Sequence, residues 1–236
     1  MKIPPLHPWN VSVEEALRIQ NELRERVVLR DQTERIRTVT AVDVGYPGPE
    51  KMALGCAITF TYPDLRVVGK AFSLQEVSFP YIPGLLAFRE APVIISALQK
   101  LEGSSDLLIV DGQGYAHPRY MGLATHLGIY LDMSSVGCAK SHLWGTYGEP
   151  APNKGSYEYL RDGEQVVGAV LRTKDRVTPV FVSSGHKISL ERSIRVILSL
   201  CKFRIPEPLR IVHQELKRMR APLLSTSTLT GRRHPL

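Results

Sequence analysis

The sequence predicts an α/β fold in which helices cover both faces of a mixed β-sheet. Three strand-like runs separated by short turns occupy the first part of the 236-residue chain. Alternating helical and strand-like patterns follow, and two helical patterns come last. Strands joined by short turns pair antiparallel, whereas strands that alternate with helices pair parallel. The order of the patterns therefore predicts a sheet with both kinds of pairing.

A helix is predicted first, at Ser12–Leu29. Ser12 is a good N-cap, Glu15 follows at the capping-box spacing, and apolar residues recur at helical spacing. Three strands come next, at residues 38–46, 51–62 and 66–77. The sequences PGPE and PDL between them favour tight turns, so we expect an antiparallel meander.

The middle of the chain alternates helix and strand. The predicted elements are a helix at residues 91–101, a strand at 104–112, a helix at 122–132 and a strand at 134–140. A second hairpin is expected from strands at 165–173 and 178–185, followed by helices at 189–203 and 206–220. This order fits a ribonuclease H-like layout, although other mixed sheets share it.

The chain is predicted to form a single domain. With 43% hydrophobic residues it can bury a large core, and neither an internal repeat nor a linker divides residues 1–220. Residues 221–236 are polar and basic, and we expect them to form a flexible C-terminal tail.

Charge and cysteine content restrict the function classes. The formal net charge of +7 favours an anionic partner such as nucleic acid without requiring one. No apolar run is long enough to cross a bilayer, and the N-terminus lacks a signal-peptide pattern. Cys56, Cys138 and Cys201 are far apart in apolar surroundings, which argues against disulfides or a zinc site. We expect a soluble, cytoplasmic protein without an obligate protein partner.

Two aspartates stand where acids are rare. Asp43 lies in the middle of an apolar strand, where a lone carboxylate is costly unless a cation or hydrogen bonds meet it. Asp111 ends a short apolar strand, at the edge where open sheets bind ligands. Taken singly, each is explained equally well as a helix cap, a partner of a buried arginine or a turn residue.

Glu90 is the third unusual acid. At 100° per residue it falls on the inward arc of its predicted helix, with Leu86 and Val93, whereas Arg89 falls on the outward arc. Pro92 weakens this prediction, because it has to kink the helix or start a new one.

Together the three acids predict a metal site. Carboxylates that meet at one sheet edge suit Mg²⁺ or Mn²⁺, which prefer oxygen ligands. Such an ion activates water and stabilises the oxygens of a displacement at phosphorus. A basic protein with this site is a candidate nuclease.

His213 and His117 are the candidate histidines. His213 shares the apolar arc of its helix with Leu209 and Leu216, so we expect it to face the sheet, with Glu215 on the opposite arc. A histidine on an apolar face is more often a core residue than a ligand. His117 enters the loop after the second aspartate, but it is also explained as an ordinary loop residue.

Several motifs resemble those of the endonuclease V family. They are VDVGYP at Asp43, FPYIPGLLAFRE at Glu90, DGQGYAHPR at Asp111, VGCAKSHLWGT at Lys140, VLRTKD at Lys174, FVSSGH at His186 and PEPLRIVH at His213. They follow the family's order and spacing over roughly residues 10–220. PYIPGLLAFRE and DGQGYAHPR are long enough to be specific by themselves.

The resemblance implies a ribonuclease H-like, metal-dependent endonuclease acting in DNA repair. The family recognises hypoxanthine, as deoxyinosine in DNA, and hydrolyses the second phosphodiester bond on its 3′ side, leaving 3′-hydroxyl and 5′-phosphate ends. Mg²⁺ is the implied cofactor, with Mn²⁺ as an alternative. Asp43, Glu90 and Asp111 match the metal-binding acids, His213 matches the active-site histidine, and Lys140 matches a lysine near the catalytic centre.

The resemblance also implies residues that contact the substrate. A wedge that enters the strand at the lesion matches Pro80, Tyr81, Ile82 and Pro83. Prolines fix the backbone in advance, and an aromatic ring can stack in place of an extruded base. The base pocket matches Gly84, Leu86, Gly112, Gly122 and Leu143. Candidates for supporting the site or contacting phosphates are His117, Arg119, Lys154, Arg172, Lys174 and Arg176.

Other functions stay open. The substrate is either deoxyinosine in DNA or inosine in RNA, since the family includes members that act on each of them. A different ribonuclease H-like nuclease, cutting hybrids or junctions, would keep the acids but would not need the PYIP wedge. A non-catalytic nucleic-acid binding module would have no use for the three acids.

Overall fold

A mixed eight-stranded sheet organises the described part of the molecule. The computed structural model describes residues 5–48 and 51–229. The strands are β1 (Thr38–Gly45), β2 (Met52–Thr61), β3 (Val67–Glu76), β4 (Leu107–Val110), β5 (Ser135–Ala139), β6 (Tyr157–Asp162), β7 (Gln165–Leu171) and β8 (Val180–His186). Their order in the sheet is β3-β2-β1-β4-β5-β8-β7-β6. β1, β4 and β5 pair parallel, and the other neighbours pair antiparallel, so the predicted mixed sheet and its meander are confirmed.

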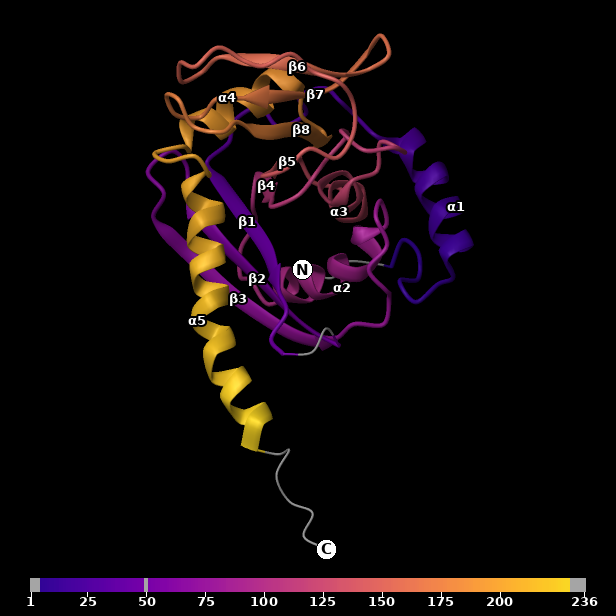
Figure 1. Cartoon of the computed structure of the whole chain (residues 1–236). Coiled ribbons are helices and arrows are strands. Elements are labelled where there is room, and N and C mark those ends of the chain that lie inside the picture. The colour runs from indigo at the N-terminus through magenta and orange to yellow at the C-terminus, as the bar shows by residue number, and fades with distance from the viewer. Residues whose placement is uncertain (1–4, 49–50, 230–236) are drawn as a thin grey trace, which may run out of the picture.

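Helices cover both faces of the sheet, as predicted. They are α1 (Val13–Leu23), α2 (Leu86–Gln99), α3 (Leu123–Leu131), α4 (Leu190–Ser199) and α5 (Glu207–Leu229), with a 3₁₀ turn η1 at Arg24–Arg26. Figure 1 shows α5 along one side of β1–β3, with α2 and α3 on the other. α1 packs outside α2 and α3 through a third apolar cluster. Within the described residues, no helix is both long and apolar enough to span a membrane.

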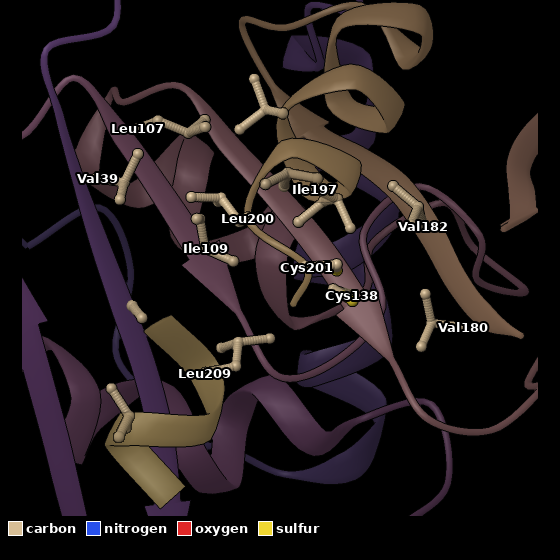
Figure 2. Close-up of a cluster of buried hydrophobic side chains, with 14 of the residues drawn as sticks. Val39, Leu107, Ile109, Cys138, Val180, Val182, Ile197, Leu200, Cys201 and Leu209 are labelled. Atoms are coloured by element: carbon tan, nitrogen blue, oxygen red, sulfur yellow. The ribbon is translucent and has the colours of Figure 1, made fainter. Parts of the chain in front are cut away.

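The alternation of side chains along β4 explains how both layers attach. Leu107 and Ile109 join the core under α4 and α5, while Leu108 and Val110 join the core under α2 and α3. Successive strand residues point to opposite faces, so a strand buried on both faces has to be apolar throughout. Figure 2 shows Leu107 and Ile109 in the first of these cores, which is closed by residues of α4 and α5.

The first helix is shorter than predicted. α1 ends at Leu23, whereas the prediction extended the helix to Leu29. Val28 instead forms backbone hydrogen bonds with the end of β8, where its carbonyl accepts from the Lys187 amide at 2.6 Å. The Val28 amide also donates to His186 Nδ1 at 3.2 Å. These long-range bonds hold the segment in an extended form that periodicity along the chain does not reveal.

Two further elements differ from the prediction. β6 was not predicted, because YEYLRD lacks an apolar alternation; it is the last strand of the sheet, where it pairs with β7, and its Arg161 forms an isolated bridge with Thr146. α5 continues to Leu229, beyond the predicted end at residue 220 and into the predicted flexible tail. Ala221, Leu223 and Leu224 are good helix formers, so basic and polar composition alone did not end the helix. Residues 230–236 of that tail lie outside the described part of the chain.

Candidate active site

The two predicted aspartates meet at the carboxyl ends of adjacent parallel strands. In the register of β1 and β4, Val42 lies opposite Val110. Asp43 and Asp111 each come directly after this pair, so they stand side by side at one edge of the sheet. The Asp111 amide donates to the carbonyl of Val42 at 3.3 Å, which continues the strand pairing to this point.

Glu90 approaches the same edge from α2. Burial raises the pKa of Glu90 to about 7, and the charges of Asp43 and Asp111 add to the rise, against the opposing effect of a hydrogen bond from Tyr46. Burial, followed by the charge of Asp111, raises the pKa of Asp43 to about 6. The three carboxyl groups therefore lie close enough to repel one another. The structure brings together the acids that the sequence singled out.

Each acid also has a partner from the protein. Lys140 Nζ forms an ion pair with Asp111 Oδ2. His213 Nδ1 lies 3.3 Å from Asp43 Oδ2. The Tyr46 hydroxyl donates to Glu90 Oε1 at 2.9 Å. Lys140 and His213, which were predicted from the family motifs, thus contact two of the acids directly.

Tyr46 and Arg89 are site residues that the sequence reasoning missed. The Arg89 Nε donates to the Tyr46 hydroxyl at 3.1 Å, and its Nη1 donates to the Phe79 carbonyl at 2.9 Å. Arg89 is buried, so its predicted place on the outward arc of α2 was wrong. The prediction that Glu90 points inward was correct. The side of α2 that carries Arg89 is also covered by protein, including Phe79 in the segment before the PYIP wedge. The proline at position 92 lies inside α2 without ending it.

The donor set fits a hard divalent cation by its chemistry. Within residues 5–48 and 51–229, no three acid, histidine or cysteine side chains stand in a ready-made metal-binding arrangement. The oxygens of Asp111 and Glu90 are directed at Lys140 and Tyr46 instead. Clustered carboxylates with raised pKa values favour a cation, because a positive ion removes their mutual repulsion.

Helix α5 turns His213 towards the sheet, as predicted. The His213 side chain reaches Asp43 on β1, yet it stays 47% exposed. Glu215 was predicted on the opposite arc, and this was wrong: its side chain is only 15% exposed and Oε2 lies 2.7 Å from Lys70 Nζ on β3. α5 crosses both β1 and β2, so residues on either flank of its apolar arc reach the sheet.

The predicted wedge borders a small pocket. Tyr81 is 65% exposed and, with Ile82 and Pro83, lines a cavity of about 110 Å³. Pro80 is exposed and does not line the cavity, and Ile82 also packs against the apolar cluster that contains α1. The four wedge residues therefore do not all point in the same direction. The lining residues from the predicted base pocket are Gly84, Leu86, Gly122 and Leu143, and those not predicted for it are Ala87, Gln113, His117, Met121 and Leu123. Gly112 is not part of the lining.

Three side chains hold Gly84, the residue directly after the wedge, through its backbone carbonyl. We call Gly84 the wedge foot. The Gly84 oxygen accepts from His117 Nε2 at 3.0 Å, Arg119 Nη2 at 2.7 Å and Gln20 Nε2 at 3.1 Å. Gly84 has φ +80°, and a Cβ at this position would lie 2.7 Å from Arg119 Nη2, so glycine is required. Gln20 is a fully buried residue of α1 that the sequence reasoning missed.

His117 supports this foot as a neutral ring. Burial, and then the charge of Arg119, lowers the pKa of His117 to about 4. Its Nδ1 accepts from the Arg119 amide at 3.1 Å, so Nε2 carries the proton that it donates to Gly84. The explanation as an ordinary loop histidine does not hold, because the side chain is buried at 3% exposure.

The predicted phosphate-contacting residues divide into two groups. Arg119 also donates to Gln20 Oε1 at 2.6 Å, and Arg172 is buried against Glu149 and backbone carbonyls. Both guanidinium groups are therefore engaged in contacts within the protein. Lys154 Nζ bonds the Cys201 carbonyl at 3.1 Å. Lys174 and Arg176 are exposed in the turn between β7 and β8. Sequence alone could not separate these groups, because all five are basic residues in loops or at strand ends.

Comparison with known proteins shows the family of this chain. The sequence model of the family Endonuclease V matches residues 21–214. The chain is 49% identical over 207 residues to Endonuclease V of Dictyoglomus turgidum, covering 87% of this chain and 90% of that protein. The crystal structure of Endonuclease V from Streptomyces avermitilis superposes with a TM-score of 0.86 at 38% identity, covering 97% of this chain and all of that one.

A third relative carries nucleic acid. The crystal structure of Ciona intestinalis Endonuclease V is a complex with a 23mer DNA containing an inosine followed by a ribo-adenosine. It superposes with a TM-score of 0.79 at 25% identity, covering 90% of this chain and 100% of that chain. The predicted ribonuclease H-like fold is confirmed by these structural neighbours together with the mixed sheet. The protein is a nuclease, and it belongs to the Endonuclease V family.

Proposed function

We propose that this nuclease is a Mg²⁺-dependent endonuclease that recognises hypoxanthine in nucleic acid and hydrolyses the second phosphodiester bond on its 3′ side. The products carry 3′-hydroxyl and 5′-phosphate ends, and the reaction starts DNA repair. One observation carries the proposal: at a single edge of the sheet, burial raises the pKa of Asp43 and of Glu90, and the negative charge of Asp111 adds to both rises. The Ciona relative, solved with inosine-containing DNA, supports the choice of lesion.

Asp43, Asp111 and Glu90 are the residues that would hold the ion. A divalent cation supplies an activated water and stabilises the charge that develops on the phosphate oxygens. Mn²⁺ has the same preference for oxygen ligands and is expected to replace Mg²⁺. Glu90 has to leave the Tyr46 hydroxyl, or share its oxygens, in order to become a ligand. His213 touches Asp43 and orients that carboxylate from α5.

Lys140 has a role on the substrate side of the acids. Its ammonium group pairs with Asp111 and is 43% exposed, so it is accessible to a phosphate. A carboxylate engaged with a divalent cation attracts the lysine less, which frees the ammonium group for the scissile phosphate. Lys140 therefore positions the strand and balances its charge.

The wedge and its pocket supply lesion recognition. Tyr81 is exposed at the rim of the cavity, where its ring can occupy the space left by an extruded base. Gly84 and Gly122 keep the cavity wall free of side chains. The three donors on the Gly84 carbonyl fix the wedge before the substrate arrives, so little conformational entropy is lost on insertion.

A second candidate substrate is inosine in RNA. The nucleotide after the inosine in the Ciona complex is a ribonucleotide, so that relative accommodates a 2′-hydroxyl next to the lesion. The same pocket in this chain would read the base of either nucleic acid.

One cleavage assay tests both candidates. The substrates are matched DNA and RNA oligonucleotides with a single inosine, an adenine control, an RNA–DNA hybrid and a junction, each incubated with Mg²⁺, Mn²⁺ or EDTA. We expect inosine-dependent cutting one nucleotide beyond the lesion, with no cutting in EDTA. Cutting of the hybrid or junction without inosine dependence would refute the proposed lesion, and binding without cleavage would indicate a non-catalytic module.

A further inference from the structure

Phe203 is an aromatic ring exposed between α4 and α5. Its side chain is 50% exposed, although the residues around it in sequence are anchored in the core. Figure 2 shows Cys201 and Leu209 inside the core, with Cys201 next to Cys138 of β5. The loop is thus held at both ends, and its aromatic ring stays at the surface.

Two cations from separate elements lie against this ring. Lys174 Nζ, from the turn between β7 and β8, is 5.8 Å from the ring centroid. Arg210 Cζ, from the first turns of α5, is 5.1 Å from it. Glu207 pairs with Arg210 through two hydrogen bonds of 3.0 and 2.9 Å. Lys174 forms no ion pair with any acid in the described part of the chain, so the unpaired positive charge beside the ring is that of Lys174. We call Phe203, Lys174 and Arg210 the Phe203 patch.

Hydrogen bonds connect the Phe203 patch to the candidate active site. Arg204 Nη2 donates to the carbonyl of Lys140 at 2.9 Å, and Arg204 Nε donates to the carbonyl of Thr178 at 2.9 Å. The Lys140 side chain pairs with Asp111, and Leu143, three residues further along, lines the wedge pocket. The order of contacts is therefore wedge pocket, Lys140 segment, Arg204 and then the Phe203 patch.

A flat apolar ring flanked by cations is the chemistry that binds a nucleotide. A base or sugar packs on the ring, and the phosphate lies against the positive side chains. Counted from the pocket, the Phe203 patch lies beyond Lys140 in this order of contacts. If the lesion occupies the pocket and the cut is made at the acids, the part of the strand on the 3′ side of the cut continues in that direction.

We propose that the Phe203 patch binds a nucleotide of the cut strand at least two positions past the scissile bond on its 3′ side, with its base or sugar on Phe203 and its phosphate at Lys174. This inference rests on the proposed function. The patch holds the strand after the cut position and contributes to substrate affinity rather than to the chemical step.

Single-turnover cleavage tests the inference. Phe203→Ala, Phe203→Tyr and wild type are compared on inosine oligonucleotides with a long 3′ flank and on ones that end one nucleotide past the cut. Tyr157→Ala is the matched control, because Tyr157 is an exposed aromatic residue on the edge strand β6. Thermal unfolding of each variant verifies that the fold is unchanged.

The expected result is a change in affinity that depends on the 3′ flank. Phe203→Ala should raise the half-saturating enzyme concentration about tenfold on the long substrate, with an unchanged maximal rate. The difference should disappear on the truncated substrate, and Phe203→Tyr and Tyr157→Ala should behave as wild type. Lys174→Gln should lower the slope of log affinity against log salt by about one contact.

Other outcomes overturn the inference in distinguishable ways. If wild type cuts after inosine and Phe203→Ala is equal to it, or loses as much on the truncated substrate, the Phe203 patch does not bind the 3′ flank while the proposed function stands. If wild type does not cut after inosine, the proposed function fails and the inference fails with it.

Discussion

The two ends of β4 carry aspartates in opposite electrostatic situations. Asp106 precedes the strand, and one of its oxygens accepts hydrogen bonds from the Arg37 amide at 2.8 Å, the Thr38 amide at 2.9 Å and the Thr38 hydroxyl at 3.1 Å. Asp111 follows the strand and lies beside Asp43, whose pKa is raised by burial and by the charge of Asp111. One end fastens the strands together, whereas the other holds like charges close together.

This difference separates structural acids from functional ones. A carboxylate that is satisfied by backbone amides stabilises the fold and needs nothing more. Carboxylates that repel one another cost stability until a cation arrives, so their retention indicates a function. The wedge foot resembles the Asp106 end, because the Gly84 carbonyl has three donors.

Removing a carboxylate from the functional end should have the largest effect. We expect Asp43→Ala or Asp111→Ala to lower the cleavage rate by about three orders of magnitude or more, since each removes a proposed ion ligand. Binding to an inosine oligonucleotide, measured by fluorescence anisotropy, should largely survive. Full activity in either variant would remove that residue from the mechanism.

In the metal-free protein, replacing the aspartate by asparagine should raise the free energy of unfolding at Asp43 and lower it at Asp106. Because the folded state raises the pKa of Asp43 from 3.8 to about 6, it holds the proton more tightly than the unfolded chain. Stability therefore falls as the pH rises through this window and stays low above it. We expect Asp43→Asn to raise the free energy of unfolding above this window by on the order of 2–3 kcal/mol, and to have no effect well below it.

Asp106→Asn is the matched control for this measurement. It removes the negative charge of the group that accepts three hydrogen bonds at one oxygen, and hydrogen bonds to a charged acceptor are the stronger ones, so urea unfolding should show a loss of stability at neutral pH. Equal effects of the two substitutions would contradict the distinction between the two ends. Added Mg²⁺ should stabilise wild type and leave Asp43→Asn nearly unchanged.

A smaller effect is expected at the wedge foot. Gln20→Leu leaves the Arg119 Nε without its acceptor and removes one donor from the Gly84 carbonyl. We expect a loss of about 1–2 kcal/mol in the free energy of unfolding and a weaker preference for inosine over adenine. Gln32→Leu, at an exposed position, is the control and should change neither quantity. An unaltered preference would mean that the foot does not position the wedge.

The smallest effect concerns the tip of the wedge. Tyr81→Ala should reduce discrimination between inosine and adenine by about tenfold, because one base–aromatic stacking contact is lost. The ring is exposed, so melting temperature and Mg²⁺ affinity should stay the same. Tyr81→Phe keeps the ring and should retain discrimination. A preference for inosine that does not change in Tyr81→Ala would exclude the wedge role.

Local sequence was sufficient for the elements that position the aspartates. The apolar run before Asp111 could only be a strand buried on both faces, and the helical arc of Glu90 pointed it inward. The family motifs added Lys140 and His213, which do contact the acids. The polar edge strand β6 and the continuation of α5 beyond residue 220 were missed because neither shows the apolar period that such reasoning depends on.

The sequence by itself determined the mixed sheet with its antiparallel meander, the two buried aspartates and the inward glutamate, because local turns and side-chain periods of 2 and 3.6 residues indicate which element a segment forms and which face a residue occupies. Only the tertiary structure decided that Arg89 is buried on Tyr46, that Gln20 and Arg119 hold Gly84, and that Phe203 stays exposed beside two cations. These contacts join residues far apart in the chain. Their geometry depends on how whole layers pack, which no local pattern encodes.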